Sequence, residues 1–290
     1  MRILSIQSSV AYGHVGNSAA VFPLQRLGHE VIAVNTVHFS NHTGYGAWRG
    51  AVIEPAVISD VIEGVAERDA LRSVDAVLTG YQGSPGVAAV VLETVARIRA
   101  LNPDAVYCAD PVMGDVGRGM FVLPGVPELI REKVVPVADV LTPNAFELSY
   151  LAFGGDPGAV DVGRVGTLDD VLAAVDAVRA MGPRTVLVTS VQGSVVDDDQ
   201  IGMIAVDDSG AYLVRTPELP LSVNGAGDVT AALFLAHLRD GVSTALARVA
   251  SSIYGILAAT HTAGSREIAL IPAQDLVADP PTEFAVERLR

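Results

Sequence analysis

The chain has 290 residues, of which 50% are hydrophobic, and its 19 basic and 33 acidic side chains give a formal net charge of −14. This length suits one large α/β domain, residues 1–290, and the acidic balance predicts no nucleic-acid or anionic-membrane partner. Lys133 is the only lysine and Cys108 the only cysteine, which excludes a lysine-bearing P-loop, a disulfide framework and a thiolate zinc cluster.

The first half of the chain alternates short apolar runs with longer segments of helical spacing. In chain order we predict strand Arg2–Gln7 closed by Ser8-Ser9, helix Asn17–Leu27 ended by Gly28, strand Glu30–Val37, polar segment His38–Gly50, helix Pro55–Asp69, strand Asp75–Thr79, helix Gly86–Ala100 and strand Ala105–Ala109. The N-terminus begins with a strand pattern, and we expect no signal peptide and no membrane-spanning run, which favours a cytoplasmic protein.

The second half continues the alternation and adds a hairpin. We predict helix Val126–Val134, strand Asp139–Leu141, helix Ala145–Phe153, surface loop Gly154–Gly166, helix Leu168–Met181, strand Thr185–Thr189, hairpin strands Ile201–Val206 and Ala211–Arg215, helices Asp228–Arg239 and Ser243–Thr262, and a proline-punctuated tail. Strands that alternate with helices predict a three-layer α/β/α fold with a central, mostly parallel sheet.

A glycine-rich turn stands before the apolar helix that starts at Asp228. Gly225 and Gly227 flank Ala226, and glycines at a helix N-terminus let backbone N–H groups turn toward an anion such as a phosphate. Asp228 has two interpretations: a first-turn capping acid, or a carboxylate that accepts a hydroxyl proton while the N–H groups steady a transferring phosphoryl group. Taken alone, this short motif favours the cap.

Two further acids follow predicted strands. Asp110 directly follows Ala105–Ala109, and Glu147 stands at the third helical position after Asn144, a spacing typical of a capping box. The alternative is that Glu147 reaches Mg²⁺ or its waters beside nucleotide phosphates. Ligands in parallel α/β sheets bind beyond the carboxyl ends of the strands, so Asp110, Glu147 and Asp228 are expected to converge on one crevice. Convergence is not expected from the capping interpretations.

The sequence resembles the pyridoxal kinases of the ribokinase-like superfamily from Ile3 to about Leu270. The resemblance is densest at Leu4–Ser8, Val15–Ala20, Asn35–Trp48, Leu78–Tyr81, Asp110–Gly114, Thr142–Asn144 with Glu147, Val188–Ser190 and Gly225–Asp228. Phe39–Tyr45, which reads Phe-Ser-Asn-His-Thr-Gly-Tyr, is far more specific to this family than the glycine turn, which the whole superfamily shares. The resemblance implies ATP-dependent phosphorylation of the hydroxymethyl group of pyridoxal, and of pyridoxine and pyridoxamine, in vitamin B6 salvage.

The resemblance also implies roles for individual residues. Asp228 acts as the base, and Gly225, Ala226 and Gly227 form the anion hole, with Ala226 where many relatives have threonine or valine. The substrate pocket consists of Ser8 and Thr43 as polar contacts, Phe39 and Tyr81 beside the ring, and Val15 and Gly44 as lining. The nucleotide side consists of Asp110, Thr142, Asn144, Glu147, Thr189, Thr216, Pro217, Glu218 and Leu219, with Asp110 and Glu147 toward Mg²⁺, Glu147 through water.

Other interpretations remain open for several of these residues and for the function. Phe39 and Val15 also suit the core, Ser8 a strand-end cap and Tyr81 an amphipathic surface. A hydroxymethylpyrimidine kinase and a non-catalytic B6- or nucleotide-binding regulator are the alternative functions. The resemblance further implies Mg²⁺, ATP as co-substrate, a monovalent cation and a homodimer, whereas loop Gly154–Gly166 has no clear counterpart.

Overall fold

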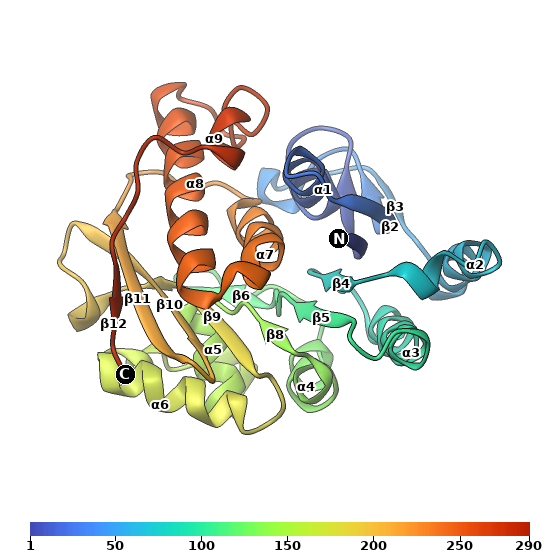
Figure 1. Ribbon diagram of the computed structural model, residues 1–290, viewed down its shortest axis with the longest axis horizontal. Helices are drawn as coiled ribbons and strands as arrows, with labels where there is room; N and C mark the ends of the chain where they lie inside the picture. Colours follow the sequence, from blue (N-terminus) through green and yellow to red (C-terminus); the bar gives the residue numbers. More distant parts are fainter.

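A ten-stranded sheet runs through the centre of the computed structural model, which describes residues 1–290 (Figure 1). Its strand order is β12-β11-β10-β9-β8-β5-β4-β1-β2-β3. The six parallel strands are β1 (Arg2–Val10), β2 (Glu30–Phe39), β4 (Ala76–Thr79), β5 (Val106–Ala109), β8 (Val140–Leu141) and β9 (Thr185–Val191). The antiparallel strands are β3 (Gly50–Val52) at one edge and β10 (Gln200–Asp207), β11 (Gly210–Pro217) and β12 (Val286–Arg288) at the other.

Helices cover both faces of this sheet, as Figure 1 shows. On one face lie α1 (Asn17–Arg26), α7 (Ala226–His237), α8 (Val242–Thr262) and α9 (Asp275–Ala278); on the other lie α2 (Pro55–Ala66), α3 (Pro85–Leu101), α4 (Val126–Leu129), α5 (Ala145–Phe153) and α6 (Leu168–Arg179). Successive side chains of a strand point to opposite faces, so Ile3 joins the core beneath α7 and Leu4 the core above α3. The three-layer prediction is confirmed.

Helix α7 has apolar residues on every side, as expected for a helix that is enclosed by other helices and the sheet. All residues from Val229 to Leu235 are buried, and the helix packs against α1 and α8 over the sheet. Its N-terminus therefore has a fixed position at the edge where the parallel strands end.

Several predicted boundaries need correction. Ser8 and Ser9 do not close β1; after a register shift between Gln7 and Ser9, the strand continues to Val10 because Ser9 and Val10 pair with the extended end of β2. The helix predicted at Val126–Val134 is a short α4 followed by a π-helical turn at Ile130–Val134. The tail contributes α9 and edge strand β12, whose pairing with β11 is a long-range contact without a local sequence pattern.

The expectation of no membrane-spanning run also needs correction. Helix α8 is long and apolar enough, by length and composition alone, to cross a membrane. Half of its apolar window is buried in the fold, where it packs against α7, β10 and β11, and such a core helix passes the same test.

Candidate active site

Asp228 lies where the order of the parallel strands reverses. The chain runs from β1 to β2 on one side and then returns to place β4 on the other side of β1, which is the kind of position where α/β sheets bind ligands. A β-carbon placed on Gly80, just after β4, would lie 3.5 Å from Asp228 Oδ1. The sheet thus brings Asp228 from the far end of the sequence to the carboxyl end of β4.

The turn before α7 depends on Gly225. Gly225 is the N-cap, with a φ of 91° in the left-handed region, and a β-carbon there would collide with the carbonyl oxygen of His14. No side chain caps this helix, so the N–H groups of its first turn remain available to an anion. The predicted helix start at Asp228 is two residues late, because Ala226 and Gly227 already belong to α7.

The Asp228 carboxyl has an altered acidity. Its pKa is raised to about 6, chiefly because burial disfavours the charged form, while the backbone N–H groups of Gly16 and of Asp228 itself act in the opposite direction. Gly16 stands at the N-cap of α1, where a β-carbon would collide with Ser8. A carboxylate with this pKa is ionised at neutral pH and is a stronger base than an exposed aspartate.

Asp110 faces the same turn of α7. Thr142 Oγ1 donates a hydrogen bond to Asp110 Oδ1 at 3.0 Å, whereas Oδ2 points elsewhere: a β-carbon on Gly227 would lie 4.0 Å from it. Burial, and then the negative charges of Glu147 and Asp228, raise the pKa of Asp110 well above its ordinary value. Asp110 therefore lies near enough to both Glu147 and Asp228 for their charges to affect it, but the three acids do not by themselves form a group that could hold a metal ion.

Glu147 forms the capping box that its spacing predicts. Asn144 Oδ1 accepts from the Glu147 N–H at 2.8 Å, and Glu147 Oε2 accepts from the Asn144 N–H at 3.0 Å. Glu147 Oε1 also accepts from Met113 N–H at 2.9 Å. Burial raises the pKa of Glu147 to about 8, although these N–H groups act to lower it. Its two oxygens already hold backbone donors, so the side chain fixes the loop after β5 in place.

These acids fit a divalent cation unequally. Asp110 offers an oxygen without a protein donor, directed at the first turn of α7, and a cation there would offset the charges of Glu147 and Asp228 that raise its pKa. Glu147, with both oxygens engaged by backbone N–H groups, suits a contact through water. The donor set is thus one direct carboxylate and one indirect one, which is enough for Mg²⁺ bound also by phosphates.

The residues predicted for a ring pocket gather around the ends of β1, β2 and β4. Ser8 is buried near the end of β1, and the half-buried Phe39 ends β2, where its ring centroid lies 6.1 Å from that of Trp48. Tyr81 follows β4, and burial raises the pKa of its hydroxyl. Thr43 begins a 3-10 turn beside these strand ends, and Gly44 follows it. Val15 precedes α1 and is half-buried.

The residues predicted for a nucleotide lie at the ends of β5, β8, β9 and β11, on the opposite side of β4 from β1 and β2. Thr142 contacts Asp110, and Asn144 forms an isolated parallel bridge with Thr189 of β9. The segment Thr216–Leu219 leaves β11 toward α7, with Thr216 buried and Glu218 bound by the side chain of Gln192 at 2.8 Å. No hydrogen bond joins this segment to the three acids.

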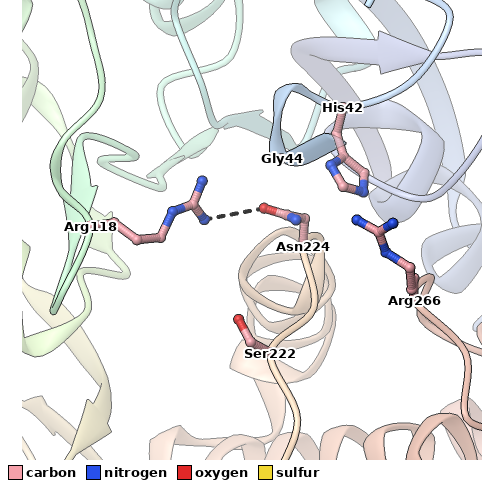
Figure 2. Close-up of a pocket in the computed structure, with 6 residues that line it drawn as sticks. All are labelled: His42, Gly44, Arg118, Ser222, Asn224 and Arg266. Carbon is pink, nitrogen blue, oxygen red and sulfur yellow. Dashed lines mark hydrogen bonds between the residues drawn. The ribbon is translucent and has the colours of Figure 1, made fainter. Parts of the chain in front are cut away.

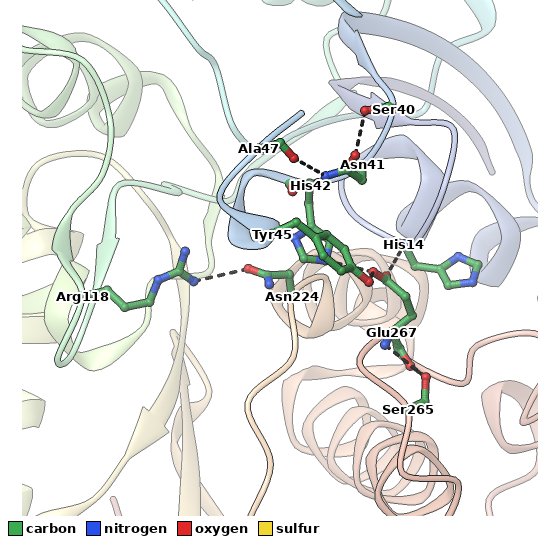
Figure 3. Close-up of polar contacts among 10 residues, drawn as sticks. All are labelled: His14, Ser40, Asn41, His42, Tyr45, Ala47, Arg118, Asn224, Ser265 and Glu267. Carbon is green, nitrogen blue, oxygen red and sulfur yellow. Dashed lines mark hydrogen bonds and ion pairs between the residues drawn. The ribbon is translucent and has the colours of Figure 1, made fainter. Parts of the chain in front are cut away.

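Sequence reasoning missed Glu267, which ties two loops of the site together. Its carboxylate accepts from Tyr45 Oη at 2.7 Å and from the His14 N–H at 3.1 Å, and it pairs with His42 Nε2 at 3.0 Å; these residues are drawn in Figure 3. The hydrogen bond to Glu267, and to a smaller extent burial, raise the pKa of Tyr45 to about 12. The only local signal was an acid between the end of α8 and the apolar run Ile268–Ile271, and this pattern is too common to single out a site residue.

Comparison with known proteins gives a consistent result. The family model described as phosphomethylpyrimidine kinase matches residues 25–267. Pyridoxal kinase PdxY of Leifsonia xyli subsp. xyli is 56% identical over 291 residues, covering 100% of both chains, and that of Rubrobacter xylanophilus is 55% identical over 292 residues, covering 100% of this chain and 98% of the relative. The solved pyridoxal kinase from Leishmania donovani in complex with ADP and ginkgotoxin has 33% identity and a TM-score of 0.91, covering 100% of this chain and 99% of its own.

Proposed function

The chain belongs to the pyridoxal kinases, and we propose on that premise that Asp228 is the base of an ATP-dependent transfer to the hydroxymethyl group of pyridoxal, giving pyridoxal 5'-phosphate in vitamin B6 salvage. The observation that carries the proposal is the position of Asp228. It lies at the strand-order reversal, in the first turn of an uncapped helix, and near Asp110, whose pKa is raised by burial and then by the charges of Glu147 and Asp228. The proposed base, the free N–H groups of the helix N-terminus and the neighbouring acid Asp110 thus lie close together.

The transfer requires alignment more than covalent chemistry. A primary alcohol is a weak acid, but phosphoryl transfer has a loose transition state whose charge rests on the equatorial oxygens. In the proposed mechanism the first-turn N–H groups of Ala226 and Gly227 donate to those oxygens, and Asp228 accepts the hydroxyl proton as the oxygen–phosphorus bond forms. The bond to ADP breaks in line, and the proton leaves Asp228 to solvent with the product.

We assign the cation side of the mechanism to Asp110, with Glu147 in a supporting place. Mg²⁺ bound with ATP would supply positive charge that offsets the negative charge of the phosphates. Asp110 Oδ2, which has no protein donor, would hold the ion near the turn of α7, and Thr142 fixes the orientation of the carboxylate through Oδ1. Glu147 holds the loop after β5 through Met113 and Gly114.

On the substrate side we propose that Phe39 and Tyr81 flank the flat heterocycle, while Ser8 and Thr43 contact its polar rim, with Val15 and Gly44 as lining. An aromatic ring ligand needs apolar faces and a few directional polar groups, and these residues lie at neighbouring strand ends. On the nucleotide side we propose Asn144, Thr189 and the segment Thr216–Leu219. We further propose one domain, a homodimer, a cytoplasmic location and a monovalent-cation requirement.

The family model is described as a phosphomethylpyrimidine kinase, so a pyrimidine is the alternative substrate to test. Its match spans residues 25–267, yet the relatives that share 49–56% identity over nearly the whole chain are named pyridoxal kinases. One assay separates the two activities: ATP-dependent phosphorylation of pyridoxal, pyridoxine, pyridoxamine and hydroxymethylpyrimidine, measured in parallel. We expect the B6 compounds to be preferred. A preference for the pyrimidine would refute the substrate, and no turnover of any of them would return the chain to a binding role.

A further inference from the structure

The turn at the centre of the loop between β2 and β3 carries two of the residues predicted to contact the ring. This 3-10 turn, Thr43–Tyr45, contains no buried residue, so apolar packing does not hold it in place. Asn41 shapes the loop from within, because its Nδ2 donates to the carbonyl oxygens of His42 at 3.1 Å and of Ala47 at 2.9 Å. These bonds fix the shape of the loop, whereas its position over the site depends on contacts with other parts of the chain.

Glu267 supplies those contacts. From His42 to Ala47, the only hydrogen bonds to residues outside the loop are those of His42 Nε2, at 3.0 Å, and Tyr45 Oη, at 2.7 Å, and both reach Glu267 Oε1. Figure 3 draws these three side chains together. His42 is the N-cap of the turn and Tyr45 is its last residue, so one carboxylate oxygen fixes both ends of the turn to the segment after α8.

Glu267 is itself firmly held. Its side chain is only 12% exposed, its N–H donates to Ser265 Oγ at 3.1 Å, and the next residue, Ile268, is buried in the core around α7. Gly13, with a φ of 95°, leaves room for the carboxylate, because a β-carbon there would collide with it. Glu267 is therefore a fixed part of the protein body, and the turn is the part that moves when their contacts are lost.

Arg266 adds a contact to the same tyrosine, and the turn borders open space. The guanidinium carbon of Arg266 and the centroid of the His42 ring each lie 4.6 Å from the centroid of the Tyr45 ring. His42, Gly44 and Arg266 line a polar cavity of about 260 Å³, which Arg118 of the hairpin β6 (Gly114–Asp115) and β7 (Gly119–Met120) also lines (Figure 2). A displaced turn would therefore change the shape of the site rather than that of the core.

We propose that Glu267 is a positioning residue for the ring substrate, an inference that rests on the proposed function. It holds His42 and Tyr45, and through them it keeps Thr43 and Gly44 beside the ring. Hydrogen bonds to a carboxylate are among the stronger ones in proteins, and two converge here on one oxygen. The hydrogen bonds of this carboxylate reach neither Asp228 nor the residues proposed for the nucleotide. Loss of Glu267 should therefore weaken the binding of the ring and leave that of ATP unchanged.

The test measures kcat and the KM values for pyridoxal and for ATP in Glu267→Ala, Tyr45→Phe and the double variant. Tyr45→Phe removes a single hydroxyl and keeps the test valid where Glu267→Ala fails to fold. We expect the KM for pyridoxal to rise about tenfold in Glu267→Ala and about threefold in Tyr45→Phe, with kcat and the KM for ATP within about twofold of the wild type. The double variant should match Glu267→Ala, because both changes remove the same bond.

Matched controls lie elsewhere in the chain. Glu283→Ala removes an exposed carboxylate, and Tyr254→Phe removes a hydroxyl from a ring that packs against Phe284. Neither control should change the KM for pyridoxal.

Trp48, the only tryptophan, lies in the same loop and reports its position without turnover. Its side chain is 47% exposed, and acrylamide quenching of its fluorescence in the absence of substrate should be steeper in Glu267→Ala and Tyr45→Phe than in the wild type and the controls. Equal rises in the two KM values, additive losses in the double variant, or an unchanged KM for pyridoxal or unchanged quenching in folded variants would overturn the role of Glu267. A wild type that does not phosphorylate pyridoxal would refute the proposed function, whereas the quenching comparison still decides whether Glu267 holds the loop.

Discussion

Replacing Asp228 by asparagine should separate activity from stability in this fold. Asparagine has nearly the same shape and can still occupy the first turn of α7, but it cannot accept the substrate proton. Removal of one positioned general base typically lowers the rate by roughly 10²–10⁴-fold. We therefore expect kcat for pyridoxal to fall by this factor, while the binding of ADP changes little because Asp228 faces the substrate side.

The same replacement should stabilise the protein at neutral and basic pH. The folded protein holds the pKa of Asp228 at about 6, above the ordinary value of 3.8, so the folded state binds this proton more tightly than the unfolded state. Stability is consequently lost as the pH rises from about 4 to about 6, by at most about 3 kcal/mol. Asparagine does not ionise, so the variant does not lose this stability. The variant should therefore be no more stable than the wild type near pH 4 and more stable by the full amount near pH 8.

Two measurements check this reasoning. Steady-state phosphorylation of pyridoxal gives the loss in kcat, and thermal unfolding at about pH 4 and about pH 8 gives the stability difference, expected as a rise of a few degrees in Tm at the higher pH only. Leu221→Ala, in the loop before the turn, is a nearby control that keeps the carboxylate. A folded Asp228→Asn enzyme with normal turnover would reduce Asp228 to a capping acid, and a Tm difference independent of pH would refute the burial argument.

Three further predictions follow from the same site. Glu147→Gln should lower the free energy of unfolding by about 1–3 kcal/mol, because an amide NH₂ would face the Asn144 N–H, and denaturant titration measures this; an unchanged stability with a shifted Mg²⁺ titration would instead favour a metal role alone. Ser8→Ala should raise the KM for pyridoxal by an amount that corresponds to the loss of one hydrogen bond, on the order of 1 kcal/mol, and should leave the KM for ATP unchanged. Phe39→Ala should raise the KM for pyridoxal further. An effect confined to the KM for ATP would contradict the ring pocket. The kcat/KM for pyridoxal should decrease at pH values below about 6, the pKa of Asp228, because the base becomes protonated there. A kcat/KM that stays level down to about pH 4.5 would exclude this base.

The fold was largely predictable because its elements carry local signals. Apolar strands of β-branched residues and helices with N-terminal prolines or C-terminal glycines mark their own positions, and α5 was predicted to the residue at Ala145–Phe153. Edge strands β3 and β12 were missed because they are only three residues long and owe their structure to pairing with a neighbour. The extension of β1 past Ser8 likewise depends on its partner in β2.

The acids of the site were predictable in type and in place, but their division of labour was not. Strand ends identified Asp110 and the glycine turn identified Asp228, because both signals lie within a few residues of the side chain. The choice between capping and metal contact for Glu147 depended on where Met113 and Gly114 point their N–H groups, more than thirty residues away in sequence. Only the three-dimensional contacts distinguish an engaged carboxylate from an available one.

The long-range contacts around Glu267 explain why a kinase site can be specific while its motifs are shared. The glycine turn and Asp228 are the parts proposed to act in phosphoryl transfer, whereas the loop that carries Thr43 and Gly44 takes its position from His42 and Tyr45, both bound to Glu267. That loop also borders a polar cavity lined by Arg118 and Arg266. A change at Glu267 would therefore shift the loop of Thr43 and Gly44. It would reach the turn before α7, where Gly225 lies against His14, only through the hydrogen bond from the His14 N–H.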